Sequence, residues 1–375
     1  MNRTKNCRVA QQVIRHIYIH IPFCLQKCHY CSFHSQKYSA VHLQEYLLAL
    51  WQEITAYQEI FQFQASTIYL GGGTPSLLSV AEISQILQQF EPSESAEITL
   101  EANPSTITPQ FAADLKKSAV NRISLGIQSW DDRELKMLGR SHQAATAQRA
   151  IEILRRAGFD NISLDLIYGL PQQSKTTLQN SLQKMIDLRP EHISTYCLSL
   201  EPDVPLFARK SEIPPDAEVA DFYQMIRAEL LGAGYQHYEI SNFSLPGFGS
   251  QHNSAYWQDL EYVGLGASAA GYLQGKRYQN NLLPAYLSDS KAAQIMPNAE
   301  QLSETDLKKE FIFLALRTAS GLDLSKYQQR FGSDFRAEYA DILAKYRDYL
   351  VETDKHVALQ PAVYFVSNTI LSAFM

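Results

Sequence analysis

The chain has 375 residues, of which 45% are hydrophobic, and its formal net charge is −6. This length and apolar content suffice for one large domain and a smaller one. A net negative charge without a dense Lys/Arg run argues against nucleic acid as a partner. The first twelve residues are polar and no run of eighteen apolar residues occurs, so we expect neither a signal peptide nor a transmembrane helix.

Strand-like and helix-like segments alternate along the first two thirds of the chain. The pattern predicts strands over 17–21, 67–70, 97–101, 122–128, 161–168 and 192–200. It predicts helices over 41–60, 80–90, 109–118, 131–138, 144–157, 175–188 and 216–232. This alternation indicates an α/β fold with a parallel sheet, and six such units indicate a partial (β/α)6 TIM-like barrel.

The alternation stops after the sixth unit. Residues 235–271 do not follow the strand–helix pattern. Residues 289–300 are a polar stretch that we expect to be a linker. Beyond it, helices are predicted over 306–318, 334–350 and 368–374. A short strand or hairpin is expected over 351–360. We therefore predict a barrel domain over 1–245, a segment with linker over 246–300 and a small, mainly α C-terminal domain over 301–375.

The cysteines are the most informative residues. Three of the five, Cys24, Cys28 and Cys31, follow the first strand with C-x3-C-x2-C spacing. Clustered thiols and an odd count argue against a disulfide framework and for a reducing, cytoplasmic location. We expect Cys7, in the polar N-terminal arm, to be incidental and Cys197, in an apolar strand, to lie in the core.

Thiolates select zinc, copper(I) or iron–sulfur clusters. Three thiolates on one loop leave one iron of a [4Fe–4S] cluster open, whereas a structural zinc site is closed by four ligands. Two alternatives stay open: zinc completed by His20, His29 or His34, or three unconnected buried thiols.

Residues suited to ligand binding recur where successive strands end, and in a barrel this edge carries the chemistry. The Gly71-Gly72-Gly73-Thr74 run lets backbone approach a ligand closely. Hydrogen-bonding side chains follow the later strands, namely Glu101, Gln128, Arg140 and Asp165. Taken singly, these residues could instead form a tight turn, a helix cap, a surface cation or a loop contact.

A polar and aromatic cluster follows the barrel: His252, Asn253, Tyr256 and Trp257. Such a cluster suits a flat aromatic ligand with an axial nitrogen donor. The alternative is a structural corner whose side chains hydrogen-bond the glycine-rich loop.

These motifs together resemble the oxygen-independent coproporphyrinogen dehydrogenase-like family of radical S-adenosylmethionine (SAM) proteins. The resemblance covers nearly the whole chain from residue 17 and rests on Tyr-Ile-His-Ile-Pro-Phe-Cys, C-x3-C-x2-C, Gly-Gly-Gly-Thr-Pro and Asp-Leu-Ile-Tyr-Gly-Leu-Pro. It implies a [4Fe–4S] cluster on Cys24, Cys28 and Cys31, whose open iron binds SAM. It also implies SAM contacts at Tyr18, Tyr30, Gly72, Gly73, Thr74, Glu101, Gln128, Arg140 and Asp165.

Two branches of that family differ in residues that can be read here. The dehydrogenases carry a fourth cysteine where this chain has Phe33, and a longer segment before the cluster, whereas Cys24 comes early. The haem-chaperone branch has Phe at that position and a His-Asn-x-x-Tyr-Trp motif, which this chain carries intact at 252–257. The resemblance therefore favours a haem chaperone that binds the cluster, SAM and haem and passes haem to acceptor haemoproteins.

Within that interpretation His252 is the expected haem-contacting residue, with Tyr256 and Trp257 beside it and Lys276 and Arg277 as partners for the propionates. The alternative is an enzyme, an oxygen-independent coproporphyrinogen III dehydrogenase that decarboxylates propionate side chains by radical chemistry. Whether SAM is turned over, whether the protein forms a homodimer and whether it contacts a membrane peripherally are left open by the sequence.

Overall fold

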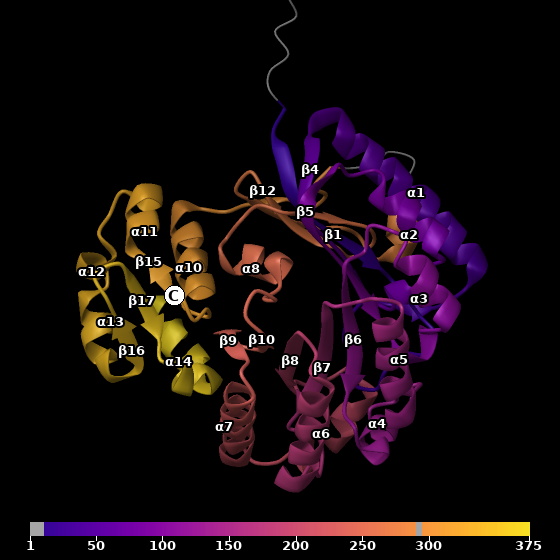
Figure 1. Ribbon diagram of the computed structural model, residues 1–375. Coiled ribbons are helices and arrows are strands. Elements are labelled where there is room, and N and C mark those ends of the chain that lie inside the picture. Colours follow the sequence, from indigo (N-terminus) through magenta and orange to yellow (C-terminus); the bar gives the residue numbers. More distant parts are fainter. Residues whose placement is uncertain (1–10, 290–294) are drawn as a thin grey trace, which may run out of the picture.

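The computed structural model describes residues 11–289 and 295–375 (Figure 1). Its main sheet has nine strands in the order β11-β1-β4-β5-β6-β7-β8-β10-β9. The six predicted strands form the parallel centre: β1 (Val13–Ile21), β4 (Gln62–Gly72), β5 (Pro92–Ala102), β6 (Arg122–Gln128), β7 (Ile162–Tyr168) and β8 (His192–Cys197). The predicted partial barrel is confirmed.

Three strands that the sequence pattern did not predict extend both edges of this sheet. β11 (Val263–Leu265) pairs with β1 in parallel, although more than two hundred residues separate them. At the other edge β10 (Asn242–Ser244) pairs antiparallel with β8 and with β9 (Gln236–Glu239). Strands of only three or four residues leave little periodicity to detect.

Seven helices cover the outer face of the sheet, as the alternation predicts (Figure 1). They are α1 (Ala40–Ile60), α2 (Val80–Leu87), α3 (Pro109–Leu115), α4 (Asp132–Met137), α5 (Ala144–Arg156), α6 (Lys175–Leu188) and α7 (Asp216–Gly232). Each strand turns its apolar residues toward these helices, since alternate side chains face opposite sides of a sheet. In β6, Ile123 and Leu125 are fully buried in this core, so Arg122, Ser124 and Gln128 face the inside of the barrel.

The C-terminal region from α10 (Glu304–Ala315) onward is mainly helical, as expected. One helix predicted there is wrong: residues 334–350 form α12 (Phe335–Glu338), α13 (Ala340–Lys345) and a 3-10 turn, η5 (Arg347–Tyr349). Tyr339 leaves the helical region with φ −115° and ψ 24°, and its ring packs on both Phe335 and Phe374. Tertiary packing here overrides local helix preference.

The rest of this region completes a small domain. α11 (Leu324–Phe331), α14 (Ser367–Leu371) and two further 3-10 turns, η6 (Pro361–Val366) and η7 (Ser372–Phe374), surround a three-stranded sheet. That sheet has the order β15-β17-β16, with β15 (Leu322–Asp323), β16 (Leu350–Glu352) and β17 (His356–Leu359) all antiparallel. The hairpin expected over 351–360 is thus present, with an added strand.

A second three-stranded sheet joins the two domains. It contains β12 (Ala270–Leu273), β13 (Lys276–Gln279) and β14 (Glu300–Gln301), and α9 (Leu283–Asp289) follows β13. Part of the linker expected over 289–300 and Cys7 lie outside the described residues. Between the barrel and the C-terminal domain lies the short helix α8 (Gln251–Trp257), near the centre of Figure 1.

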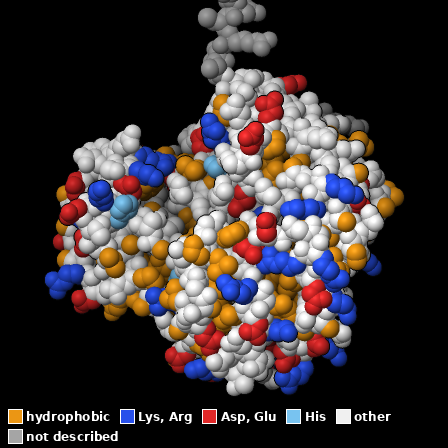
Figure 2. Space-filling model, in the orientation of Figure 1, with side chains coloured by type: hydrophobic (Ala, Val, Ile, Leu, Met, Phe, Trp, Pro, Cys, Tyr) orange, Lys and Arg blue, Asp and Glu red, His pale blue; other side chains and the backbone are white. Residues whose placement is uncertain are grey.

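The surface carries both charges. On the face drawn in Figure 2, Lys and Arg side chains lie interspersed with Asp and Glu over the larger domain. Across residues 11–289 and 295–375, none of the helices has both the length and the apolar character needed to cross a bilayer.

Candidate functional site

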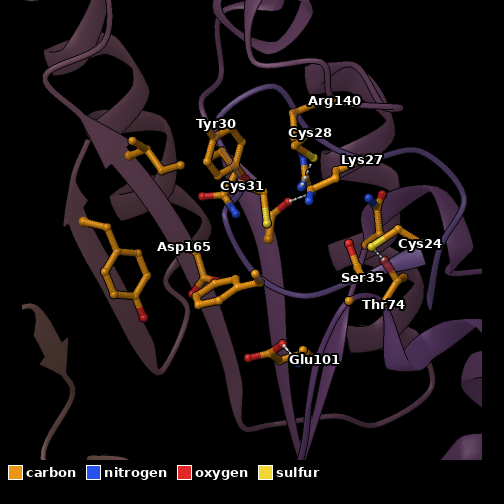
Figure 3. Close-up of a pocket in the computed structure, with 18 of the residues that line it drawn as sticks. Cys24, Lys27, Cys28, Tyr30, Cys31, Ser35, Thr74, Glu101, Arg140 and Asp165 are labelled. Carbon is orange, nitrogen blue, oxygen red and sulfur yellow. Dashed lines mark hydrogen bonds between the residues drawn. The ribbon is translucent and has the colours of Figure 1, made fainter. Parts of the chain in front are cut away.

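A cavity of about 450 Å³ opens at the carboxyl ends of the parallel strands (Figure 3). Nearly all the residues predicted for the cluster and SAM line it: Cys24, Cys28, Tyr30, Cys31, Gly72, Gly73, Thr74, Glu101, Gln128, Arg140 and Asp165. Tyr18 does not line it. Its ring stacks on Tyr69, and its hydroxyl lies 3.0 Å from His20 Nδ1, inside the barrel.

The cysteine loop is fastened to the barrel at two places. The short strands β2 (Phe23–Cys24) and β3 (Gln36–Lys37) pair where the loop leaves and returns. In the middle of the loop, the His29 backbone N–H donates to the Leu138 carbonyl over 2.9 Å. Gly139 follows at φ +69°, and a Cβ at that position would lie 2.8 Å from the His29 ring. The three thiols are therefore held on a preformed loop.

Two donors reach the cysteine sulfurs. The Thr74 hydroxyl donates to Cys24 Sγ over 3.5 Å, and Arg140 Nη1 donates to Cys28 Sγ over 3.4 Å. Burial raises the pKa of the Cys31 thiol. Donors aimed at sulfur, one of them cationic, favour thiolate ligands and suit an anionic metal–thiolate cluster.

The histidines considered as a fourth zinc ligand are engaged elsewhere. His20 Nε2 lies 2.9 Å from the His34 carbonyl, and its Nδ1 is bonded to Tyr18. His29 Nδ1 lies 2.9 Å from a backbone carbonyl of α4, and His34 Nε2 accepts from the Leu283 N–H over 3.1 Å. Each ring thus has at least one nitrogen committed to the backbone.

Two carboxylates face the cavity from β5 and β7, the strands on either side of β6. Glu101 accepts from the Tyr69 hydroxyl over 2.8 Å and from the Gly72 N–H over 3.0 Å, and burial raises its pKa to about 7. Asp165 accepts from the Ser124 hydroxyl over 3.4 Å, and burial raises its pKa to about 6. Both side chains can accept hydrogen bonds from ribose hydroxyls, and they accept them best when they are ionised.

Two buried polar atoms at this site have no hydrogen-bond partner within residues 11–289 and 295–375. Gln128 Oε1 and Arg140 Nε are buried without a hydrogen bond, although Arg140 Nη2 donates to the Gly126 carbonyl over 2.6 Å. Gln128 also has φ +74°, a conformation that costs a non-glycine residue free energy. Buried polar atoms normally find partners, so these two indicate a ligand with its own donors and acceptors.

The glycines keep the opposite wall bare. Gly72 has φ +107°, and a Cβ there would lie 2.6 Å from the His20 ring. A Cβ on Gly73 would lie 2.6 Å from the Phe23 carbonyl oxygen. Only glycine fits at these positions, so the backbone itself can approach a ligand closely. Its N–H groups already have partners: that of Gly72 donates to Glu101 over 3.0 Å, and that of Gly73 donates to the Ile21 carbonyl over 2.8 Å. The cavity therefore fits both groups that the resemblance implies, a cluster on three thiols and SAM beside it.

The sequence reading missed other residues of this wall. Ser124 and Tyr196 line the cavity, and period-2 counting back from Gln128 along β6 would have found Ser124. Cys197 was expected in the core, and that prediction is wrong: the thiol is exposed and lines the cavity, because Cys197 is the last residue of β8.

The polar and aromatic cluster on α8 lies below this cavity, on the inner face of β4 and β5. His252 is 1% exposed, with Nδ1 2.7 Å from Thr67 Oγ1 and Nε2 2.7 Å from the Tyr256 hydroxyl. Its ring stacks on Tyr69 at 5.1 Å between centroids, and burial lowers its pKa to about 3. His252 is therefore neutral, and both ring nitrogens have partners.

A buried carboxylate fixes the start of α8. Glu97 of β5 accepts from the Ser250 hydroxyl over 3.3 Å and from the N–H groups of Gln251 and His252 over 3.0 Å each. Helix N-termini favour negative charge because their first N–H groups lack partners within the helix. The motif thus forms a structural corner, but its hydrogen bonds go to β4 and β5 and not to the glycine-rich loop.

The remaining residues of the motif differ from His252. Asn253 and Trp257 are half-buried, and Trp257 lines a second cavity between the two domains. The two cations proposed as propionate partners lie on β13, where Arg277 Nε pairs with Glu310 over 2.9 Å. Neither Lys276 nor Arg277 lines either of these two cavities.

Comparison with known proteins agrees with this geometry. Residues 18–185 match the radical SAM superfamily, and residues 302–362 match the HemN C-terminal domain. The protein named haem chaperone HemW from Lactococcus lactis subsp. lactis is 37% identical over 332 residues, covering 86% of this chain and 87% of that protein. The protein of the same name from Bacillus subtilis is 31% identical over 372 residues, covering 96% and 98%.

The chain belongs to the HemW family of radical SAM proteins. Among solved structures, coproporphyrinogen III oxidase (HemN) from Escherichia coli matches with a TM-score of 0.84, at 22% identity, over 97% of this chain and 90% of that one. At this identity the match shows the fold alone. Membership of the HemW family is shown by the relatives and supported by the motifs. The fold shared with the E. coli protein extends through the C-terminal domain.

Proposed function

We propose that this protein is a haem chaperone, which binds a [4Fe–4S] cluster, SAM and haem and transfers haem to an acceptor haemoprotein. The observation that carries the proposal is the 37% identity to a protein named haem chaperone HemW over most of both chains. The intact His-Asn-x-x-Tyr-Trp motif on α8 supports it.

In this proposal the two cofactors share the cavity at the strand ends. Cys24, Cys28 and Cys31 hold the cluster, which supplies an open iron and an electron donor. The backbone of Gly72 and Gly73 and the Thr74 side chain hold the SAM amino group. The other predicted contacts that line the cavity receive its ribose, carboxylate and remaining polar groups: Tyr30, Glu101, Gln128, Arg140 and Asp165. Tyr18, which lies outside the cavity lining, supports this wall only through its stacking on Tyr69.

The haem site is proposed to involve α8. A direct contact between His252 and haem iron stays a prediction, and it requires the hydrogen bond to Tyr256 or the one to Thr67 to break. Asn253 and Trp257 are accessible without such a change. The proposal places the protein in the cytoplasm, where thiols stay reduced, and leaves open a homodimer or a peripheral membrane contact during transfer.

The second candidate is an oxygen-independent coproporphyrinogen III dehydrogenase, and one observation favours it. The fold follows that of coproporphyrinogen III oxidase from E. coli over 97% of this chain. Against it stands Phe33, 67% exposed on the cavity wall at the position where the resemblance gives the dehydrogenases a fourth cysteine.

One experiment separates the two candidates. The cluster is reconstituted anaerobically, and SAM, reductant and coproporphyrinogen III are added, with haem titrated into a parallel sample. We expect stoichiometric haem binding and no porphyrin product. Protoporphyrinogen IX formed in step with 5'-deoxyadenosine would make the protein an enzyme and overturn the chaperone proposal.

A further inference from the structure

A second cavity, of about 440 Å³, lies between α8 and the C-terminal domain. Its volume falls in the range of about 300–1,000 Å³ that is typical of small-molecule sites. Its walls come from β9, α8, α10, α11 and β17, so it exists only where the two domains meet. It shares no lining residue with the cavity that holds the cysteines.

Backbone hydrogen bonds fix the base of this interdomain cavity. The Ile240 N–H donates to the Arg317 carbonyl over 3.0 Å, and the Ala319 N–H donates to the Tyr238 carbonyl over 3.0 Å. Glu239 and Thr318 form an antiparallel bridge between them. The C-terminal domain is therefore joined to the end of β9 by strand-type pairing, and the cavity walls are held in register.

One wall offers aromatic area. Trp257 lines the cavity from the end of α8, is half-buried, and has neither a hydrogen bond nor a ring partner among the described residues. Phe311 lines it from α10, and the small residues Ala315 and Ala319 line the same cavity. Large rings beside small side chains suit a flat apolar ligand, because a plane can approach the small residues closely.

The wall from the C-terminal domain offers a nitrogen donor. The His356 side chain is 41% exposed, and neither ring nitrogen has a hydrogen bond among the described residues. His356 Nε2 lies 3.7 Å from Asp323 Oδ2. Hydrogen bonds from the start of α11, chiefly from Ser325, lower the pKa of Asp323 and keep it ionised. A carboxylate beside an imidazole is the partner that commonly orients a metal-ligating histidine.

The same wall offers a cation. Lys326 is exposed on the lining and forms no ion pair among the described residues. The second acid of the cavity, Glu239, is fully buried, accepts from the Ser241 N–H over 3.0 Å, and has its pKa raised to about 7 by burial. A ligand carboxylate therefore meets one free ammonium group here.

We propose that this interdomain cavity is the haem site, with His356 as axial ligand to the iron, Trp257 and Phe311 against the macrocycle and Lys326 at a propionate. The inference rests on the proposed function, since it says where haem binds. Imidazole is a common axial ligand of haem iron, and His356 can supply it without breaking a hydrogen bond. His252 can do so only by giving up its hydrogen bond to Tyr256 or to Thr67.

The test is a haem titration of the cluster-loaded, full-length protein, followed by difference absorbance and electron paramagnetic resonance of the ferric haem. The variants are His356→Ala, His356→Gln, Trp257→Ala, Lys326→Gln and His252→Asn. His42→Ala is the matched control, because His42 is an exposed histidine on α1. Melting temperature and cluster absorbance check that each variant is folded.

We expect both His356 variants to lose the imidazole-ligated ferric spectrum and to weaken haem binding at least tenfold. Trp257→Ala should weaken binding about threefold to tenfold and Lys326→Gln about threefold, with the axial-ligand spectrum unchanged in both. His42→Ala should match the wild type. A folded His252→Asn should keep the imidazole-ligated ferric spectrum, because His356 supplies the axial nitrogen in this proposal. His356 is half-exposed, so its replacement should leave the fold intact.

The contrary results separate the two levels of the proposal. A wild-type spectrum in the His356 variants, whether or not His252→Asn loses it, would overturn the interdomain site while leaving the chaperone function standing. A wild-type protein that binds no stoichiometric haem would remove the proposed function itself.

Discussion

The two cavities have almost the same volume, about 450 and 440 Å³, but the chain builds them in different ways. The cysteine cavity takes its walls from the ends of successive parallel strands and from one loop. The interdomain cavity takes its walls from two domains, and among its lining residues only Trp257 had been predicted as a site residue. A site made by one repeated supersecondary unit can be read along the sequence, whereas a site made by domain docking cannot.

The largest effect is expected for the cysteines. Cys28→Ser should abolish the broad visible absorbance and the bound iron of the reconstituted protein, since an alcohol is a poor replacement for a thiolate ligand. Iron and sulfide analysis measures this directly. Cys197→Ser is the matched control, because Cys197 lies on the same cavity wall, and it should keep the full iron content. An unchanged iron content in Cys28→Ser would contradict the ligand assignment.

The next effect concerns SAM and pH. The pKa of Glu101 is raised to about 7, so the ionised form that accepts ribose hydroxyls is lost as the pH falls below 7. SAM affinity of the cluster-loaded protein should therefore rise between pH 6 and pH 8, by at most tenfold per unit. Glu101→Gln should weaken binding about tenfold or more at pH 8, since hydrogen bonds to charged groups contribute about 1.5–3 kcal/mol.

The raised pKa of Glu101 affects the free energy of unfolding in the opposite direction with pH. Folded Glu101 keeps a proton that the unfolded chain releases near the ordinary value of 4.5, so its contribution to the stability of the SAM-free protein falls as the pH rises from about 4.5 to about 7. Glu101→Gln should remove this part of the pH dependence in urea unfolding. A SAM affinity that is flat with pH in the wild type would contradict the ribose role of Glu101.

A smaller effect tests the anchoring of α8. Glu97→Gln keeps the size of the side chain but removes the negative charge that meets three donors at the start of α8. We expect a loss of about 1–2 kcal/mol in the free energy of unfolding. Glu94→Gln, at an exposed position of the same strand, should change it by less than about 0.5 kcal/mol. Equal losses in both variants would show that Glu97 does not hold the helix specifically.

These comparisons show what the sequence can predict. Cysteine spacing and the βα alternation gave the barrel and nearly the whole cysteine cavity, because strand ends collect at one edge whatever the details of packing. Tyr18 faces the inside of the barrel instead, two residues before His20 on the same face of β1. His356 carried no signal, since a single histidine in a short strand says nothing of what lies across a domain junction. Tyr339, where the predicted helix breaks, packs on Phe374, which is thirty-five residues away, and no local pattern contains that contact.

The smallest effect distinguishes the two roles considered for His252. Tyr256→Phe removes the hydroxyl that lies 2.7 Å from His252 Nε2 and leaves that nitrogen buried without a protein partner. If His252 is structural, the free energy of unfolding should fall by about 1 kcal/mol or somewhat more, and haem binding should stay at the wild-type level. If His252 is the haem ligand, freeing its nitrogen should strengthen haem binding despite the lower stability.

Tyr262→Phe is the matched control, because Tyr262 packs edge-on against Tyr256 at 4.4 Å without bonding to His252. Tighter haem binding in Tyr256→Phe alone would return the axial position to α8, and unchanged binding would leave it to the interdomain cavity.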